Sequence, residues 1–320
     1  MKSKILFTFI RRLRIVTLLS NIKNYRWLRH NVELYRQYGI HRKLWQPLSY
    51  ASISKHSNDI PWLDKDIDSS AVKAAPMFHS FSPEIQQQLL QWKDKGYMIV
   101  KGFFDEQKIE KVEKSILPSI PKKKRLAYFN NRILNLFENN KEVESIFKDP
   151  ALLKILSFVL GKDVLPFQTI NFYKSSSQPA HSDHLHLTTE PLGYLIAVWV
   201  ALEDVQPGCG EFMYYPGSHR LPYLMNNNFH HDNTAWKIDA MHDRKYEDRI
   251  ADEIKEYNLK MEVFQPKKGD IIIWHANLLH GSIPVVRPEL TRKSLVMHYF
   301  AKDVLCYHES IEKPAIIKAS

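Results

Sequence analysis

The first regular pattern of apolar and polar positions lies after residue 81 and predicts helices. Ser82 and Pro83, followed by an acid, are typical of a helix start, because serine caps the first turn and proline fits its first position. Apolar residues then recur at helical spacing as far as Gly96, where glycine ends the helix. The same signals predict a second helix over residues 105–116 and a third over residues 150–160.

From residue 164 the pattern changes to short runs rich in β-branched and aromatic residues, separated by Gly and Pro turns. Such runs are typical of strands. The predicted strands cover residues 97–100, 165–173, 194–200, 212–215, 270–274 and 294–300. Because no helices separate the later strands, we expect a mainly β fold with flanking helices, an antiparallel sandwich or jelly roll. A polar stretch over residues 221–257, with a helical piece over 246–257, predicts an insertion beside the barrel mouth.

These patterns divide the chain into four parts. A globular domain over residues 81–305 follows an N-terminal arm (1–45) and a turn-rich connector (46–80), and a C-terminal tail (306–320) ends the chain. The length of 320 residues is enough to bury one full core. Two cysteines cannot form a disulfide framework or a Cys-rich zinc site, so we expect a reducing, cytoplasmic compartment.

The net charge of +10 belongs to the arm. Residues 1–45 contain eleven Lys and Arg against one acid, whereas the remaining chain has 34 residues of each sign. This distribution excludes a nucleic-acid-binding face across the core. An apolar stripe runs through the arm at helical spacing, formed by Leu6, Phe9, Ile10, Leu13 and Val16. Three interpretations stay open: packing on the protein's own body, peripheral membrane contact and a presequence.

The densest polar cluster is His181-Ser-Asp183-His184-Leu-His186. At the end of a strand, residues two apart point to the same side, so His181 and Asp183 present one imidazole and one carboxylate to a common point. Two histidines and one carboxylate on one face of Fe(II) leave open positions for oxygen and a chelating co-substrate. His184 and His186 face the opposite way and lack a carboxylate.

The third ligand and the co-substrate anchor must come from later strands. His280 and His275 are the candidates for the ligand; His280 precedes Gly281, where the chain can turn tightly, whereas His275 directly follows a strand run. Twelve residues after His280 comes Arg292, with Ser294 nearby. A guanidinium grips a carboxylate with two parallel hydrogen bonds, and a hydroxyl can add a third. 2-Oxoglutarate carries such a distal carboxylate.

With these candidate residues and the segments around them, the sequence resembles the phytanoyl-CoA dioxygenase family of Fe(II)- and 2-oxoglutarate-dependent oxygenases, over about residues 81–302. The resemblance rests on segments 96–104, 178–183, 199–204, 215–220, 269–270, 280–282 and 292–300. It implies a double-stranded β-helix, cupin-like fold, in which His181, Asp183 and His280 bind iron and Arg292 binds 2-oxoglutarate. It also implies further co-substrate contacts, for which Trp199 and Gln168 are the positions available beside Ser294.

The expected function is therefore hydroxylation of a small organic molecule, lipid-like or a secondary metabolite. We expect Fe(II) as the cofactor, and 2-oxoglutarate and O2 are consumed in a reaction that releases succinate and CO2. We expect a monomer or dimer, without a nucleic-acid partner. The alternative is a non-catalytic protein that keeps the β-helix scaffold, binds a ligand and associates with membranes.

Overall fold

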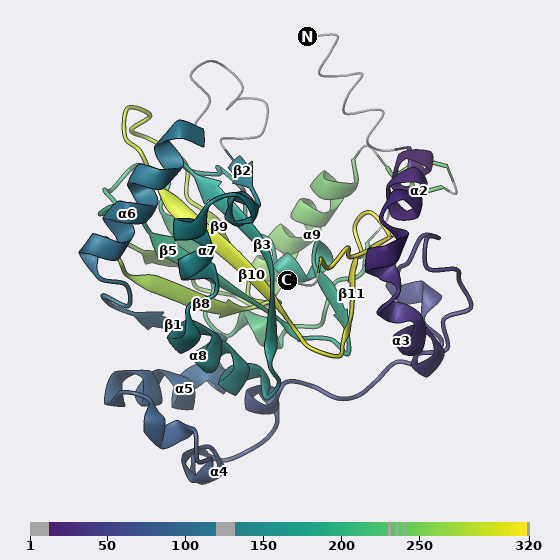
Figure 1. The fold of residues 1–320 in the computed structure, drawn as a ribbon, viewed down its shortest axis with the longest axis horizontal. Coiled ribbons are helices and arrows are strands. Elements are labelled where there is room, and N and C mark those ends of the chain that lie inside the picture. The colour runs from purple at the N-terminus through teal and green to yellow at the C-terminus, as the bar shows by residue number, and fades with distance from the viewer. Residues whose placement is uncertain (1–12, 120–131, 230–231, 235, 240, 319–320) are drawn as a thin grey trace.

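The computed structural model describes residues 13–119, 132–229, 232–234, 236–239 and 241–318. Its centre is a six-stranded antiparallel sheet with the strand order β1-β8-β5-β10-β3-β2 (Figure 1). The strands are β1 (Tyr97–Val100), β2 (Arg132–Leu134), β3 (Val164–Phe172), β5 (Leu195–Ala201), β8 (Ile271–His275) and β10 (Ser294–Ala301). Five of them agree with the predicted strands to within about a residue at each end, and β2 was not predicted.

A small sheet with the order β7-β6-β9 lies over the inner face of the large one. Side chains alternate between the two faces of a strand. Trp199 and Trp274 therefore pack inward with Phe212 and Phe264 of the small sheet, whereas Val198 belongs to the helix-side core. The small sheet consists of β6 (Phe212–Tyr214), β7 (Glu262–Phe264) and β9 (His280–Ser282). This two-sheet sandwich confirms the expected mainly β fold.

Four helices cover the outer face of the large sheet (Figure 1). They are α5 (Pro83–Lys95), α6 (Glu106–Ile116), α7 (Lys141–Phe147) and α8 (Pro150–Leu160). The predicted ends of α5 are confirmed, since the Ser82 hydroxyl accepts a hydrogen bond from the Ile85 amide and Gly96 adopts a left-handed φ of +72°. The helices α6 and α8 also match their predictions, whereas α7 was not predicted.

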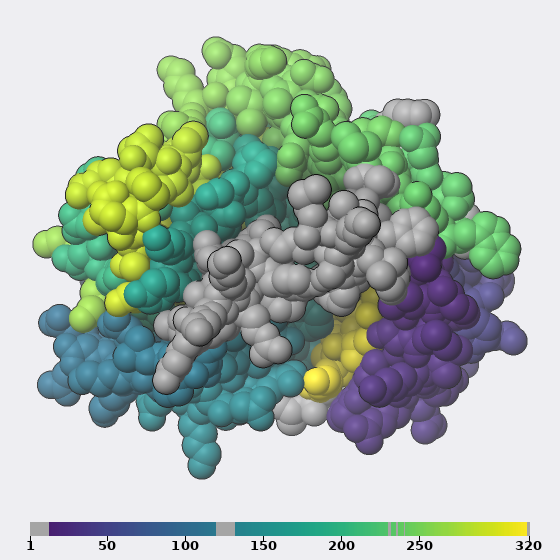
Figure 2. Space-filling view, turned by 90° about the horizontal axis from the view of Figure 1, so that it is seen from above, coloured from purple at the N-terminus to yellow at the C-terminus, as the bar shows by residue number. Residues whose placement is uncertain are grey.

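Segments from both ends of the described chain pack together. Leu28, Tyr35 and Leu48 form one buried cluster with Leu305 and Tyr307 of β11. Figure 2 shows the first helices beside the C-terminal residues on one face of the molecule. The elements there are α2 (Arg14–Lys23), α3 (Asn31–Gln37) and the sheet β12-β11-β4, formed by Lys313–Pro314, Leu305–His308 and Thr188–Glu190; α4 (Ser69–Ala74) follows in the connector. The four-part division of the chain stays a prediction.

The apolar stripe predicted for the arm falls largely outside the described residues, which begin at Leu13. Val16, its last member, is 37% exposed on α2. Within the described part of the chain, no helix is both long and apolar enough to cross a membrane.

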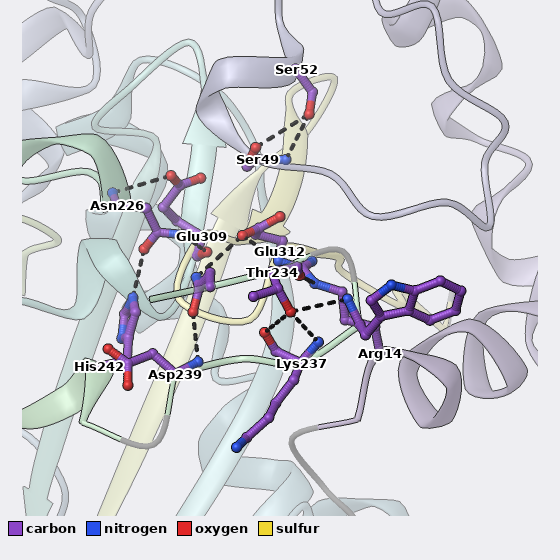
Figure 3. Close-up of polar contacts among 12 residues, drawn as sticks. Arg14, Ser49, Ser52, Asn226, Thr234, Lys237, Asp239, His242, Glu309 and Glu312 are labelled. Atoms are coloured by element: carbon purple, nitrogen blue, oxygen red, sulfur yellow. Dashed lines mark hydrogen bonds and ion pairs between the residues drawn. The ribbon is translucent and has the colours of Figure 1, made fainter. Parts of the chain in front are cut away.

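Buried polar contacts join these terminal segments to the insertion (Figure 3). The Glu309 carboxylate accepts hydrogen bonds from the amides of Tyr50 (2.7 Å) and Asn226 (3.3 Å). Arg14 of α2 forms an ion pair with Glu312 at 2.7 Å. Connector, insertion and C-terminal segment are therefore held together around one buried carboxylate.

The predicted insertion contains a helix, α9 (His242–Glu256), which begins four residues before the expected start. Its buried face, formed by Tyr246 and Ile250, packs on Leu185 and Tyr215. Leu185 lies two residues after Asp183, so α9 packs directly behind the segment that carries the predicted metal ligands.

Candidate metal centre

The segments that carry His181 and His280 are paired through their backbones. The amide of each residue donates to the carbonyl of the other at 2.9 Å. The Ser282 amide also donates to the Gln178 carbonyl at 2.9 Å, so residues 178–181 run antiparallel to β9 as a further edge of the small sheet. This pairing brings together two histidines that are 99 positions apart in the sequence.

The approach of these two segments requires glycine at position 281. A Cβ atom there would lie 2.7 Å from the Pro179 carbonyl oxygen and 2.8 Å from that of Gln178, which is closer than real Cβ contacts. The glycine that the sequence analysis interpreted as a turn residue therefore permits close strand packing beside the ligands.

Three ligand atoms converge in the space between these segments. The Nε2 atoms of His181 and His280 lie 3.9 Å and 3.6 Å from Asp183 Oδ1, respectively. The possible ligand atoms of the three residues all lie within 4.8 Å of one another, and all three residues are buried. His181, Asp183 and His280 could therefore hold a metal ion on one face.

Hydrogen bonds fix the orientation of both imidazoles. Nδ1 of His181 donates to the Pro179 carbonyl (2.8 Å), and Nδ1 of His280 donates to the Leu278 carbonyl (2.9 Å). Because Nδ1 carries the proton in each ring, Nε2 keeps its lone pair for a metal.

The protonation states suit metal binding as well. Burial lowers the pKa of His181 to about 3 and also lowers the pKa of His280, so both rings are neutral at pH 7. Burial alone would raise the pKa of Asp183, but the imidazoles that face it lower this pKa below its usual range. Two neutral imidazoles and an ionised carboxylate are the forms that coordinate a divalent metal.

The second oxygen of Asp183 has its own contacts, which sequence reasoning missed. The Trp274 indole Nε1 donates to Oδ2 at 2.9 Å, and His298 Nε2 lies 3.5 Å from the same oxygen. Both residues point inward from strands of the large sheet, and strand alternation is the signal that places them on that face.

The competing histidines lie elsewhere. His275 contacts Asp64 at 3.1 Å, and His184 lies 3.2 Å from the Met225 sulfur. His219 contacts the Lys93 carbonyl (3.1 Å), as expected for a structural residue. His186 contacts Ser310 and lines a larger cavity beside the metal centre.

Arg292 lies in an inner cavity of about 70 Å³ that His181, Asp183 and His280 also line. Its side chain is 2% exposed, and Nη1 donates to the Gly210 carbonyl (2.9 Å) and to the Ser282 hydroxyl (3.1 Å). Burial lowers its pKa to about 10, so the guanidinium remains charged at pH 7. No carboxylate of the described residues forms an ion pair with it.

The donors of the inner cavity fit a bound anion. Arg292 Nε and the Trp199 indole Nε1 are buried and have no hydrogen-bond partner in the described structure. Leaving buried donors unpaired costs free energy, so a cavity that presents a cation and a second donor suits a dicarboxylate such as 2-oxoglutarate. Trp199, which the resemblance suggested, lines this cavity, and its contact with 2-oxoglutarate stays a prediction.

The two remaining candidates occupy other places. Ser294 is fully buried, its hydroxyl has no partner among the described residues, and it does not line the inner cavity. Gln168 lines the larger neighbouring cavity. The hydroxyl that contacts Arg292 belongs to Ser282, which was not predicted. The co-substrate roles of Ser294 and Gln168 stay predictions.

Comparison with known proteins shows to which family the sequence belongs. Residues 92–293 match the family model described as phytanoyl-CoA dioxygenase (PhyH). The chain belongs to the phytanoyl-CoA dioxygenase family. Among curated members, it is 25% identical over 195 residues to the peroxisomal phytanoyl-CoA dioxygenase of Rattus norvegicus, covering 57% of this chain and 53% of the relative. The Homo sapiens protein is 24% identical over 199 residues, covering 56% and 54%. The chain thus spans about half the length of these phytanoyl-CoA dioxygenases.

Solved structures resemble this family member in fold. A non-haem α-ketoglutarate-dependent carbocyclase from nogalamycin biosynthesis aligns with a TM-score of 0.55 and 16% identity, covering 76% of this chain and 96% of the other. EctD from S. alaskensis with bound Fe aligns with a TM-score of 0.51 and 18% identity, covering 86% of both chains. These likenesses confirm the expected cupin-like double-stranded β-helix.

Proposed function

We propose that this protein is an Fe(II)- and 2-oxoglutarate-dependent dioxygenase that hydroxylates a small organic molecule. The observation that carries the proposal is the convergence of His181, Asp183 and His280 beside a cavity that contains the buried Arg292. Membership of the phytanoyl-CoA dioxygenase family supports it.

The chain's own residues position and shield the reactants. His181 Nε2, His280 Nε2 and one oxygen of Asp183 would hold the iron, and Trp274 would hold the other Asp183 oxygen in place. Arg292 would bind the distal carboxylate of 2-oxoglutarate. When bound, iron would supply the oxidising chemistry together with 2-oxoglutarate and O2. The 2-oxoglutarate would be converted to succinate and CO2.

Replacing Asp183 by Ala tests the proposal. The variant should lose at least about 100-fold of the succinate released from 2-oxoglutarate in the presence of Fe(II), because one metal ligand is missing. Asp252→Ala, at an exposed position on α9, is the matched control and should keep wild-type turnover. Thermal unfolding of both variants checks that they are folded. Unchanged succinate release by Asp183→Ala would refute the ligand assignment.

The competing function is a binding protein that keeps the scaffold without turnover. A wild-type protein that binds Fe(II) and 2-oxoglutarate, yet releases no succinate with or without a metabolite extract, would support this alternative. The presence of all three ligands and the buried arginine favours the enzyme.

We also propose that this enzyme is cytoplasmic and makes peripheral contact with an anionic membrane surface. On α2, Ile15, Leu19 and Ile22 are 53%, 59% and 50% exposed and share one helix face. Exposed cations, Lys23 and Arg26, lie directly after them. An apolar stripe flanked by cations suits an anionic lipid surface.

Point substitutions test this contact better than removal of residues 1–45, because Leu28 and Tyr35 belong to a buried cluster. The double variant Leu19→Ser and Ile22→Ser should lower co-sedimentation with phosphatidylglycerol vesicles by about tenfold, since about 3 kcal/mol of apolar burial is lost at most. Val286→Ser, an exposed apolar residue far from α2 in the sequence, is the control. Equal binding by all forms would exclude this contact.

A further inference from the structure

A second, larger cavity opens beside the metal centre. Its volume is about 500 Å³, and it shares Arg132, His181, Asp183 and His298 with the inner cavity. We call it the outer chamber. Because two of the metal ligands line it and Arg292 does not, it is the space in which a substrate would meet the metal.

The wall of the outer chamber is polar. Apart from Ile170, Pro179 and Leu187, every lining residue in the described part of the chain carries a polar side chain. A binding site for a long acyl chain would present mainly apolar surface, because burial of unpaired polar groups beside a hydrocarbon costs free energy. The composition of the wall therefore favours a polar ligand.

Three imidazoles outside the ligand set face this chamber. Nδ1 of His308 donates to the His186 carbonyl at 2.7 Å, and His186 Nδ1 lies 3.3 Å from the Ser310 hydroxyl. Burial lowers the pKa of His308 to about 4, so this ring is neutral at pH 7. Neutral imidazoles can bind hydroxyl and amino groups without repelling a cation.

The third imidazole, His298, is the best-placed ligand contact in the chamber. Its side chain is 5% exposed and lines both cavities; Nε2 lies 3.5 Å from Asp183 Oδ2, and Nδ1 has no hydrogen-bond partner in the described structure. A buried polar group without a partner in a cavity wall indicates that a ligand completes its hydrogen bonds.

Helix α9 adds negative charge to the wall. Asp243, Tyr246 and Glu247 have helical i, i+3, i+4 spacing and all line the chamber. The Tyr246 hydroxyl accepts a hydrogen bond from the Ser182 amide (3.0 Å), which fixes the helix next to the metal ligands. Glu247 forms no ion pair with any described residue, and Arg132 is the only lysine or arginine among the described residues of the wall.

We infer that the substrate is a small, polar, hydroxyl- or amine-bearing molecule with a positive charge, and not an acyl-CoA or another lipid. This inference rests on the proposed dioxygenase function. The metal end of the chamber binds the polar part through His298, His186 and His308. The two carboxylates of α9 attract the cationic part and are positioned to exclude anions such as CoA esters.

Fractionation of a cell extract tests the substrate class without knowledge of its identity. The wild-type protein is incubated with Fe(II) and 2-oxoglutarate, and each fraction is assayed for stimulated succinate release and for a product one oxygen heavier. The stimulating activity should be retained on a cation-exchange resin at pH 7. Activity confined to the flow-through, to an anion-exchange eluate or to the lipid phase would overturn the inference, as would stimulation by palmitoyl-CoA.

Failure of the inference and failure of the proposed function give different results. A protein that releases no succinate under any condition contradicts the dioxygenase function. A protein that releases succinate without added substrate, and responds to lipid or anionic fractions alone or to no fraction, contradicts only the substrate class.

A charge reversal on α9 provides a second test. Glu247→Lys should raise the amount of the cationic fraction needed for half-maximal stimulation by at least about tenfold, because an attractive charge becomes repulsive. Asp252→Lys, at an exposed position on the same helix outside the chamber wall, should change it less than about twofold. Glu247→Gln, which keeps the shape of the side chain, should give an intermediate effect. Equal responses of the three variants would overturn the inference.

Discussion

Each metal-facing imidazole is held from behind by a carbonyl two residues earlier in the chain. His181 uses the Pro179 carbonyl and His280 uses the Leu278 carbonyl. Because these bonds are local, the orientation of each ring does not depend on a contact with the other segment. The backbone pairing of His181 with His280 brings the two oriented ligands together.

At the same scale, we predict that Arg292→Lys raises the KM for 2-oxoglutarate by at least about tenfold. Nη1 already binds Gly210 and Ser282, so the remaining guanidinium nitrogens are the donors for a carboxylate. A lysine has no planar fork and cannot make both sets of bonds. Succinate release measured against 2-oxoglutarate concentration gives the KM.

The exposed Arg287→Lys is the control for this substitution and should keep the wild-type KM. Cobalt(II) titration of Arg292→Lys should show metal affinity within about twofold of wild type. An unchanged KM for 2-oxoglutarate would contradict the role of Arg292.

The sequence indicated which side chains carry the metal chemistry, but not all of their neighbours. His181, Asp183, His280 and Arg292 could be predicted because imidazoles and a carboxylate bind iron and a guanidinium binds a carboxylate. These residue types also follow one another along the chain in the order that such a site needs. Trp274 donates to Asp183 across 91 positions, and no local spacing encodes that contact. Only the register between strands determines which inward-facing residue reaches the carboxylate.

At the scale of elements, prediction was accurate where the sequence marks both ends of an element or where its apolar run is long. The helix α5 has a capping serine and a terminal glycine, and β5 is a seven-residue buried run. The strands β2 and β9 have three residues each, too few to show alternation. Tertiary pairing, not local pattern, makes them strands.

Close contact between β9 and the segment 178–181 leads to a prediction for Gly281→Ala. The added methyl group would overlap with the carbonyl oxygens of Pro179 and Gln178, so the two segments must separate. Their separation moves His280 relative to His181, and metal affinity should fall by about tenfold or more. Cobalt(II) titration together with thermal unfolding measures both effects.

Gly102→Ala separates this effect from general backbone strain. Gly102 has a left-handed φ of +56° but open space around its Cβ position. Its substitution should lower stability by about 1 kcal/mol and leave metal affinity unchanged. Wild-type metal affinity in Gly281→Ala would show that the close packing does not control the site.

At the scale of the whole molecule, Glu309 is the buried carboxylate around which three distant segments meet (Figure 3). Burial raises its pKa from 4.5 to about 7, so the folded protein binds this proton more tightly than the unfolded chain. The stability contributed by Glu309 is therefore fully present below pH 4.5 and is lost as pH rises through about 7.

We predict that the free energy of unfolding of the wild type, relative to Glu309→Gln, falls by about 2 to 3 kcal/mol between pH 5 and pH 8. Urea unfolding of both proteins at the two pH values measures this difference. Glu84→Gln, at an exposed position in the first turn of α5, should show no comparable change. A pH-independent difference for Glu309→Gln would contradict the prediction.

The cluster that joins Leu28 and Tyr35 to Leu305 and Tyr307 has a consequence for synthesis on the ribosome. Translation proceeds from the N-terminus, so the first two residues leave the exit tunnel long before the last two are added. Until β11 emerges, the apolar side chains of the N-terminal segment lack the part of their native cover that Leu305 and Tyr307 supply. The metal centre can assemble once His280 and Arg292 have been made, but the N-terminal segment reaches its native packing only when the chain is almost complete.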